Sequence, residues 1–344
     1  MKMRMRNVLP VLLAMLVAAC SDPRQEVTEQ LTNQVLLPAH EKWHGSNAAL
    51  LVATEGFCAG ELDVSALEQA FYRTLQQWSY LQPLMMGPMA EGNRSWQVQF
   101  WPDKRNMVAR QVEDLLAAAS PLSQEALEGA SVVVQGLSAF EYVVFDEAVD
   151  LTSQGDRYCP LLTGIARHQH ALSGEVLSLW AGSEGMTVML TEFPNARFAS
   201  ADEALGSILR TQITAVDVLK KKLGVPMGRL NQGVAQPWQA EAWRSQHSAG
   251  NLQASLSGAR AVWERVRSLV ASADLVSRID AAYQDTGKKL AALPAPLVTL
   301  VQEPEQQSQL QSLYDSLDNL ETLQQVELAR DLGIQIGFNA NDGD

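Results

Sequence analysis

The apolar segment Gly136–Phe145 carries two side chains that could do chemistry, Ser138 and Glu141. Positions three apart share one face of a helix, so this hydroxyl and this carboxylate would point into the same space. A carboxylate beside Phe140 and Val143 is costly to desolvate unless a partner compensates it. Two interpretations follow: Glu141 helps to bind a ligand, or it pairs with a buried arginine and fixes the packing of two helices.

A second group of candidates lies in the irregular stretch 83–103, which is rich in aromatic and turn residues. Asn93, Arg94, Trp101 and Asp103 offer an amide, a cation, an indole and a carboxylate, a set suited to a ligand. If this loop folds over Glu141, we expect Asn93, Arg94 or Lys104 to donate to it. Asp103 also stands where it would cap a helix beginning near residue 105.

The segment His40-Glu41-Lys42-Trp43-His44 is a literal His-Glu-x-x-His. On a helix, two imidazoles at this spacing can bind zinc while the glutamate acts as a general base, as in metallopeptidases. Glu61 and Glu68 are the downstream candidates for a third ligand, whereas Pro38 and the charged Lys42 fit such a site poorly. The alternative is two histidines on an amphipathic helix. A second histidine pair, at 168 and 170, is two apart and would diverge on a helix.

Gly136, Glu141 and the residues after them resemble the Gly-x-His-x-x-Glu signature of the imelysin-like family of bacterial envelope proteins, with Ser138 where the family has histidine. Three further segments resemble family signatures: Asn93–Lys104, Leu223–Gly228 and Leu332–Asp344. The resemblance implies two packed four-helix-bundle-like units with a cleft between them. It also implies a site at residues 138 and 141, and relatives linked to iron-regulated uptake.

The departure at Ser138 bears on the expected ligand. A hydroxyl is a poor ligand for zinc or ferrous iron, so the nitrogen donor of the family motif is missing. Glu141 can still offer an oxygen to iron or another divalent or trivalent ion. The ligand-binding set that we predict is Gly136, Ser138, Glu141, Asn93, Arg94, Trp101 and Asp103.

The first residues read as an export signal, with Lys2, Arg4 and Arg6 ahead of a short apolar stretch. The sequence Val17-Ala18-Ala19-Cys20 resembles a lipoprotein cleavage box, so we expect residues 1–19 to be removed and Cys20 to be acylated. Ser21 favours the outer membrane over the inner one. The alternative is an ordinary cleaved secretory signal.

The two remaining cysteines, Cys58 and Cys159, are expected to form a disulfide in an oxidising compartment; two buried free thiols are the alternative. The formal net charge of −13 and the isoelectric point near 4.9 exclude an electrostatic footprint for nucleic acid and favour cations.

Ala, Leu, Gln and Glu recur every three or four positions in nearly every long segment, and alternating runs are scarce, which predicts an all-α protein. We expect a kink or break at Pro38, a helix end before Gly224 and Pro226, and two helical units over 20–190 and 191–344. The expected helices span 26–56, 63–82, 105–119, 124–146, 155–183, 200–223, 239–271, 273–292 and 304–328.

These observations favour a lipid-anchored binding or accessory protein without catalytic residues. Its partners would be a metal ion or small ligand, the membrane, and uptake proteins of the envelope. A zinc metallopeptidase using His40, Glu41 and His44 is the alternative, and a purely structural helical scaffold is the third.

Overall fold

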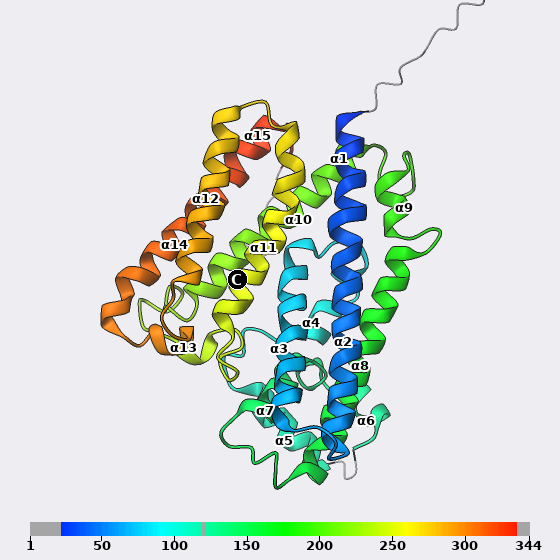
Figure 1. The fold of residues 1–344 in the computed structure, drawn as a ribbon, viewed down its shortest axis with the longest axis vertical. Helices are drawn as coiled ribbons and strands as arrows, with labels where there is room; N and C mark the ends of the chain where they lie inside the picture. The colour runs from blue at the N-terminus through cyan, green and yellow to red at the C-terminus, as the bar shows by residue number, and fades with distance from the viewer. Residues whose placement is uncertain (1–21, 119–121, 336–344) are drawn as a thin grey trace, which may run out of the picture.

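The helices of this protein form two groups that lie side by side (Figure 1). The computed structural model describes residues 22–118 and 122–335, and no strand occurs among them. The expected all-α fold with two packed bundle-like units is confirmed. The expected signal segment, Cys20, and the last nine residues of the C-terminal signature lie outside the described residues.

The first bundle is built on α2 (Leu37–Cys58), which packs against both α3 (Val64–Leu81) and α8 (Gly155–Ala181). α1 (Pro23–Leu31) runs into α2 through a π-helical turn, Thr32–Leu36. The chain therefore stays helical through Pro38, and the expected break is replaced by this wider turn. Pro38 stands just after this π-helical turn, which interrupts the regular i to i−4 hydrogen bonds where proline, without an N–H, cannot continue them.

Shorter helices close one end of this bundle and contact it from the side: α4 (Arg94–Val98), α5 (Met107–Ala118), α6 (Gln124–Glu128), α7 (Leu137–Phe145) and α9 (Met186–Thr191). The single helix expected over 124–146 is wrong, because α6 stops at Gly129 and α7 starts after Gly136. Ser131 caps a 3₁₀ turn between them. The backbone of Gly136 is extended, so the helix cannot continue through it.

The second bundle contains α10 (Ala201–Gly224), α11 (Ser248–Val266), α12 (Ala273–Ala291) and α14 (Gln307–Thr322). The short α13 (Leu297–Leu300) precedes α14, and a π-helical segment (Leu323–Leu328) leads into α15 (Ala329–Asp331). Helix α10 ends at Gly224, as the sequence indicates. The helix expected over 239–271 begins only at Ser248, because Ala242 and Gln246 take left-handed backbone angles in the turn before it.

Several contacts join the bundles: α3 packs on α11, both α10 and α11 pack on the 3₁₀ turn Gln82–Leu84, and α1 packs on α10 and α11. The buried apolar residues of both bundles form one continuous core. The expected disulfide between Cys58 and Cys159 is present and ties the end of α2 to the N-terminal part of α8. Among the described helices, none combines the length and apolar character needed to cross a membrane.

Candidate functional site

Glu141 lies where the two bundles meet, between α7 and the turn that precedes α11. Its Oε1 accepts hydrogen bonds of 2.8 Å from both the backbone N–H and the hydroxyl of Ser245. No described residue donates to Oε2, and only 6 % of the residue is exposed. Burial raises the pKa of Glu141, while the hydrogen bonds from Ser245 and the charge of Arg244 oppose that rise.

Arg244 is the buried arginine next to this carboxylate, but its hydrogen bonds go elsewhere. Its Nε lies 2.7 Å from Asp146 Oδ2, and its Nη2 donates to Asn106 Oδ1 at 2.6 Å. The guanidinium also stands over the ring of Trp243, 4.4 Å from its centroid. The ion pair that fixes the packing here therefore joins Arg244 to Asp146, and Glu141 stays outside it.

A small, partly enclosed cavity of about 20 Å³ lies beside Glu141, which is room for about one water molecule. Both bundles contribute to its wall, and most of the wall is aromatic or polar. Its lining consists of Gln99, Phe100, Trp101, Asp103, Val108, Ser138, Glu141, Trp238, Ala240, Ala242, Trp243 and Arg244. A ligand larger than an ion or a water molecule does not fit this volume unless residues of the wall move.

Ser138 and Gly136 hold the irregular stretch 83–103, here called the aromatic loop, against α7. The Ser138 hydroxyl donates to the carbonyl of Phe100 at 3.0 Å and accepts from its N–H at 3.1 Å. A Cβ on Gly136 would lie 2.5 Å from the carbonyl oxygen of Val98. Only glycine permits this approach, so these two motif residues position the wall of the cavity.

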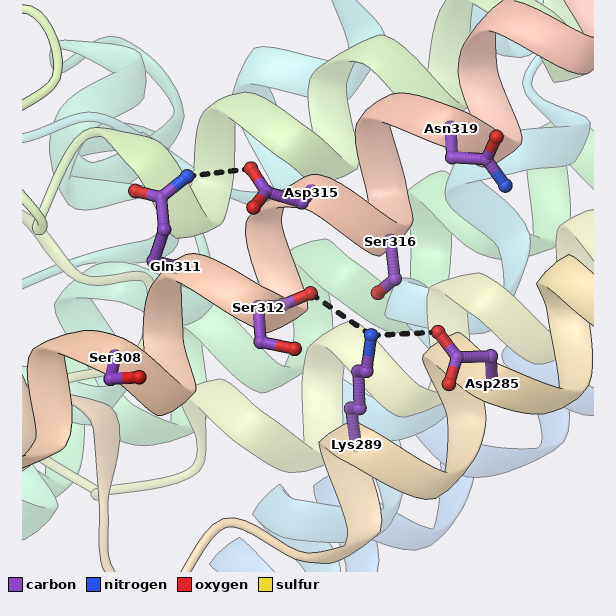
Figure 2. A pocket seen from close by; sticks show the side chains of 8 residues that line it. All are labelled: Asp285, Lys289, Ser308, Gln311, Ser312, Asp315, Ser316 and Asn319. Carbon is purple, nitrogen blue, oxygen red and sulfur yellow. Dashed lines mark hydrogen bonds and ion pairs between the residues drawn. The ribbon is translucent and has the colours of Figure 1, made fainter.

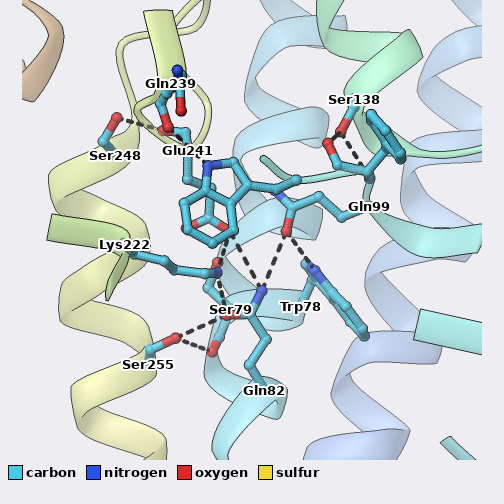
Figure 3. A network of polar contacts seen from close by, with 12 residues as sticks. Trp78, Ser79, Gln82, Gln99, Ser138, Lys222, Gln239, Glu241, Ser248 and Ser255 are labelled. Atoms are coloured by element: carbon cyan, nitrogen blue, oxygen red, sulfur yellow. Dashed lines mark hydrogen bonds and ion pairs between the residues drawn. The ribbon is translucent and has the colours of Figure 1, made fainter. Parts of the chain in front are cut away.

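A buried polar network adjoins the cavity (Figure 3). Lys222 Nζ lies 2.5 Å from Glu241 Oε1 and 2.6 Å from Gln82 Oε1. The amide oxygen of Gln99 accepts from Trp78 Nε1 at 2.8 Å and from Gln82 Nε2 at 3.2 Å. Glu241 Oε2 is sealed and has no partner among the described residues. The network joins α3, the aromatic loop and α10 to the turn before α11.

The other predicted loop residues separate into two groups. Trp101 reaches the bundle interface, where its Nε1 donates to the carbonyl of Gln239 at 2.9 Å. Both carboxylate oxygens of Asp103 cap α5, with Oδ1 accepting from Met107 N at 2.7 Å, so its expected capping role is confirmed although it also lines the cavity.

Asn93 and Arg94 lie away from the carboxylate of Glu141. Asn93 is exposed in a left-handed conformation, and Arg94 binds the carbonyl of Pro88 and the carboxylate of Glu175, each at 2.8 Å. Lys104 is exposed as well. The expectation that Asn93, Arg94 or Lys104 donates to Glu141 is therefore wrong, because Ser245 supplies both hydrogen bonds.

The alternative zinc ligands do not converge. His40 is fully buried, its Nδ1 lies 2.8 Å from the carbonyl of Leu36, and its ring contacts that of Trp180 in a tilted arrangement. Burial lowers its pKa to about 4. His44 instead contacts Ser173, two helical turns along α8 from Trp180, and Glu41 is exposed. No group of three metal-binding side chains occurs among the described residues.

Four residues of the site are missing from the prediction: Lys222, Glu241, Arg244 and Ser245. The last three were expected inside a helix that continues to residue 271, and nothing in that expectation turned this segment toward Glu141. The available signal was the run 238–248, in which charged and polar residues surround Trp238 and Trp243 without helical spacing.

An open polar groove of about 500 Å³ lies between α12 and α14 (Figure 2). Lys289 bridges it, with Nζ 2.8 Å from Asp285 and 3.2 Å from the carbonyl of Ser312. None of the predicted site residues lines this groove.

Comparison with known proteins identifies the fold. The chain is similar to the crystal structure of an imelysin-like protein from Psychrobacter arcticum 273-4, with a TM-score of 0.78, 20 % identity, and coverage of 92 % of this chain and 97 % of that one. It is also similar to a putative iron-regulated protein A precursor from Parabacteroides distasonis ATCC 8503, with a TM-score of 0.74, 12 % identity, and coverage of 90 % and 95 %. No curated protein matches the chain. The family model for imelysin, peptidase M75, matches residues 36–324, and this chain therefore belongs to the imelysin family.

Proposed function

We propose that this protein is a non-catalytic binding component of the bacterial cell envelope, which holds a metal ion at Glu141 between its bundles. The observation that carries this proposal is the unequal hydrogen bonding of the two carboxylate oxygens of Glu141. Ser245 fixes Oε1, whereas Oε2 meets no donor from the described residues beside a small cavity.

The donor atoms support a hard cation. A carboxylate oxygen with water suits ferric iron, manganese or calcium better than a soft metal, and Ser138 offers no nitrogen. The nearby positive charge of Arg244 is already balanced by Asp146. Iron is our first candidate, because one structurally similar protein carries the name of an iron-regulated protein.

An envelope location fits the expected lipid attachment at Cys20, and other uptake proteins of the envelope would be the partners. The absence of a converging ligand set around His40 and His44 gives no support to the peptidase alternative.

Calorimetric titration of the protein with ferric citrate, manganese and calcium tests the proposal. We expect one ion per chain and at least tenfold weaker binding by Glu141→Gln. Glu61→Gln removes an exposed carboxylate outside the site and serves as the matched control. Identical isotherms for wild type and Glu141→Gln would remove Glu141 from the site.

Proton release gives a second readout of the same experiment. Because burial raises the pKa of Glu141, the carboxyl group must lose its proton before it binds a cation. Binding should therefore weaken as the pH falls. Titrations in two buffers with different ionisation enthalpies should show release of a proton that Glu141→Gln abolishes.

A further inference from the structure

His44 and His170 form a stacked pair where α2 and α8 pack together. Their ring centroids lie 4.8 Å apart, and the ring planes differ by 10°. Both side chains are half-buried. One imidazole comes from the His-Glu-x-x-His segment and the other from the segment with His168 and His170. Neither histidine belongs to the Glu141 site.

Ser173 fixes the proton of His44. The hydroxyl of Ser173 donates to the carbonyl of His170 at 3.0 Å and lies 3.1 Å from His44 Nδ1. Since its only hydrogen goes to the carbonyl, the hydroxyl accepts from Nδ1–H of His44. The free lone pair is then on Nε2. Metal-binding histidines commonly have such a partner, which sets the tautomer and the orientation of the ring.

The surroundings leave room for this arrangement. A Cβ on Gly174 would lie 3.3 Å from Cε1 of His44, so glycine gives the imidazole space over α8. No described residue forms a hydrogen bond with Nε2 of His44 or with the ring nitrogens of His170. Partial burial and the neighbouring His170 lower the pKa of His44, which favours the neutral form.

We infer that His44 and His170 form a two-imidazole site for a borderline divalent transition metal, with water as the remaining ligands. Imidazole suits Cu²⁺, Ni²⁺ and Zn²⁺, and Cu²⁺ binds most tightly in the general affinity order. The parallel rings need one rotation, of the half-buried His170, to bring a nitrogen toward the lone pair of His44. Because no third protein ligand joins them among the described residues, the site is open and exchangeable.

Copper titration of the protein tests this inference, with calorimetry for affinity and electron paramagnetic resonance for the ligands. We expect one Cu²⁺ per chain with hyperfine splitting from two nitrogens. His44→Asn and His170→Asn should each weaken binding at least tenfold and leave one nitrogen. The two variants lie on different helices, so if one misfolds, the other still tests the site. Circular dichroism would reveal a misfolded variant.

His168→Asn is the matched control, because His168 lies on the same helix and its Nε2 is sealed. Wild-type affinity in both His44→Asn and His170→Asn would overturn the inference, as would an equal loss in His168→Asn. Glu141→Gln should retain copper binding at the histidine pair. The experiments therefore distinguish a failure of this inference from a failure of the proposed Glu141 site.

Discussion

Glu141 and His40 are both buried titratable side chains on helices of the first bundle, and they have different kinds of partner. The two hydrogen bonds to Glu141 come from Ser245, 104 residues away in the chain. His40 forms a hydrogen bond with Leu36, one helical turn earlier in the chain, and its ring contacts that of Trp180. A group held by a remote loop can gain or lose a ligand when that loop moves, whereas a group held by its own helical turn belongs to the packing of the helix.

Burial acts on the two groups in opposite directions. It raises the pKa of Glu141 and lowers the pKa of His40, because each side chain is cheaper to bury when neutral. The bundle interface nevertheless holds charged groups that are paired, Lys222 with Glu241 and Arg244 with Asp146. The comparison is therefore tested by substitutions that change either the paired charges of the bundle interface or the neutral side chain of His40 inside the first bundle.

The largest expected effect comes from removing the buried cation of the interface. Lys222→Ala leaves the Glu241 carboxylate buried without its partner, which costs about 3–5 kcal/mol in unfolding free energy. Urea denaturation followed by circular dichroism measures this change.

Lys221→Ala is the neighbouring control. Lys221 pairs with Asp217 one turn away and is partly exposed, so its loss should cost less than about 1 kcal/mol. Equal effects of the two substitutions would mean that the interface pair is no more important than a surface pair.

The second prediction concerns the pH dependence of His40. Between pH 6.5 and 4 the unfolded chain binds a proton at this histidine that the folded chain refuses, so stability rises with pH across this window. A pKa lowered to about 4 corresponds to about 3 kcal/mol lost as the pH falls from 6.5 to 4. Urea denaturation at several pH values should show this slope, and His40→Asn should reduce it by this amount. Part of the slope should remain, because the partly buried His44, His168 and His247 also have lowered pKa values.

Glu141 should contribute a slope of the opposite sign. Its raised pKa makes the folded state hold a proton that the unfolded state has released, so stability falls as the pH rises above the ordinary glutamate value. Glu141→Gln should therefore gain stability relative to wild type toward neutral pH. The same slope in wild type and in both variants would show that neither group titrates as its burial requires.

Helix type and position were largely predictable from sequence, because apolar spacing and caps act locally. Ser200 and Ser272 cap α10 and α12 where the pattern places helix starts. The errors fall at 129–136 and 240–247, where tertiary contacts override helical composition. Nothing in the local sequence indicates that Ala242 and Gln246 adopt left-handed angles, which non-glycine residues adopt only at a cost.

The candidate site was half predictable. Glu141 and the aromatic loop were found because a carboxylate in an apolar run and a cluster of tryptophans are visible in one segment. Ser245 and Lys222 were not found. Their role depends on which part of the second bundle faces α7, and contacts between residues so far apart in the chain leave no pattern in the local sequence. The same reason hid the pairing of His44 with His170 across two helices.

The smallest expected effects concern two glycines, Gly136 at the cavity wall, which the fold requires, and Gly45 on α2, which could be replaced. Gly136→Ala places a Cβ 2.5 Å from Val98 O and 2.7 Å from Gln97 O, so the aromatic loop must move away from α7 at a cost of about 2 kcal/mol. Gly45→Ala, in the helix that carries His40 and His44, meets nothing within 4 Å and should stabilise by about 0.5–1 kcal/mol. Urea denaturation of both variants gives the two signs. A loss at Gly45 as large as at Gly136 would mean that the α2 face is as tightly constrained as the cavity wall, and the distinction between the two regions would fail.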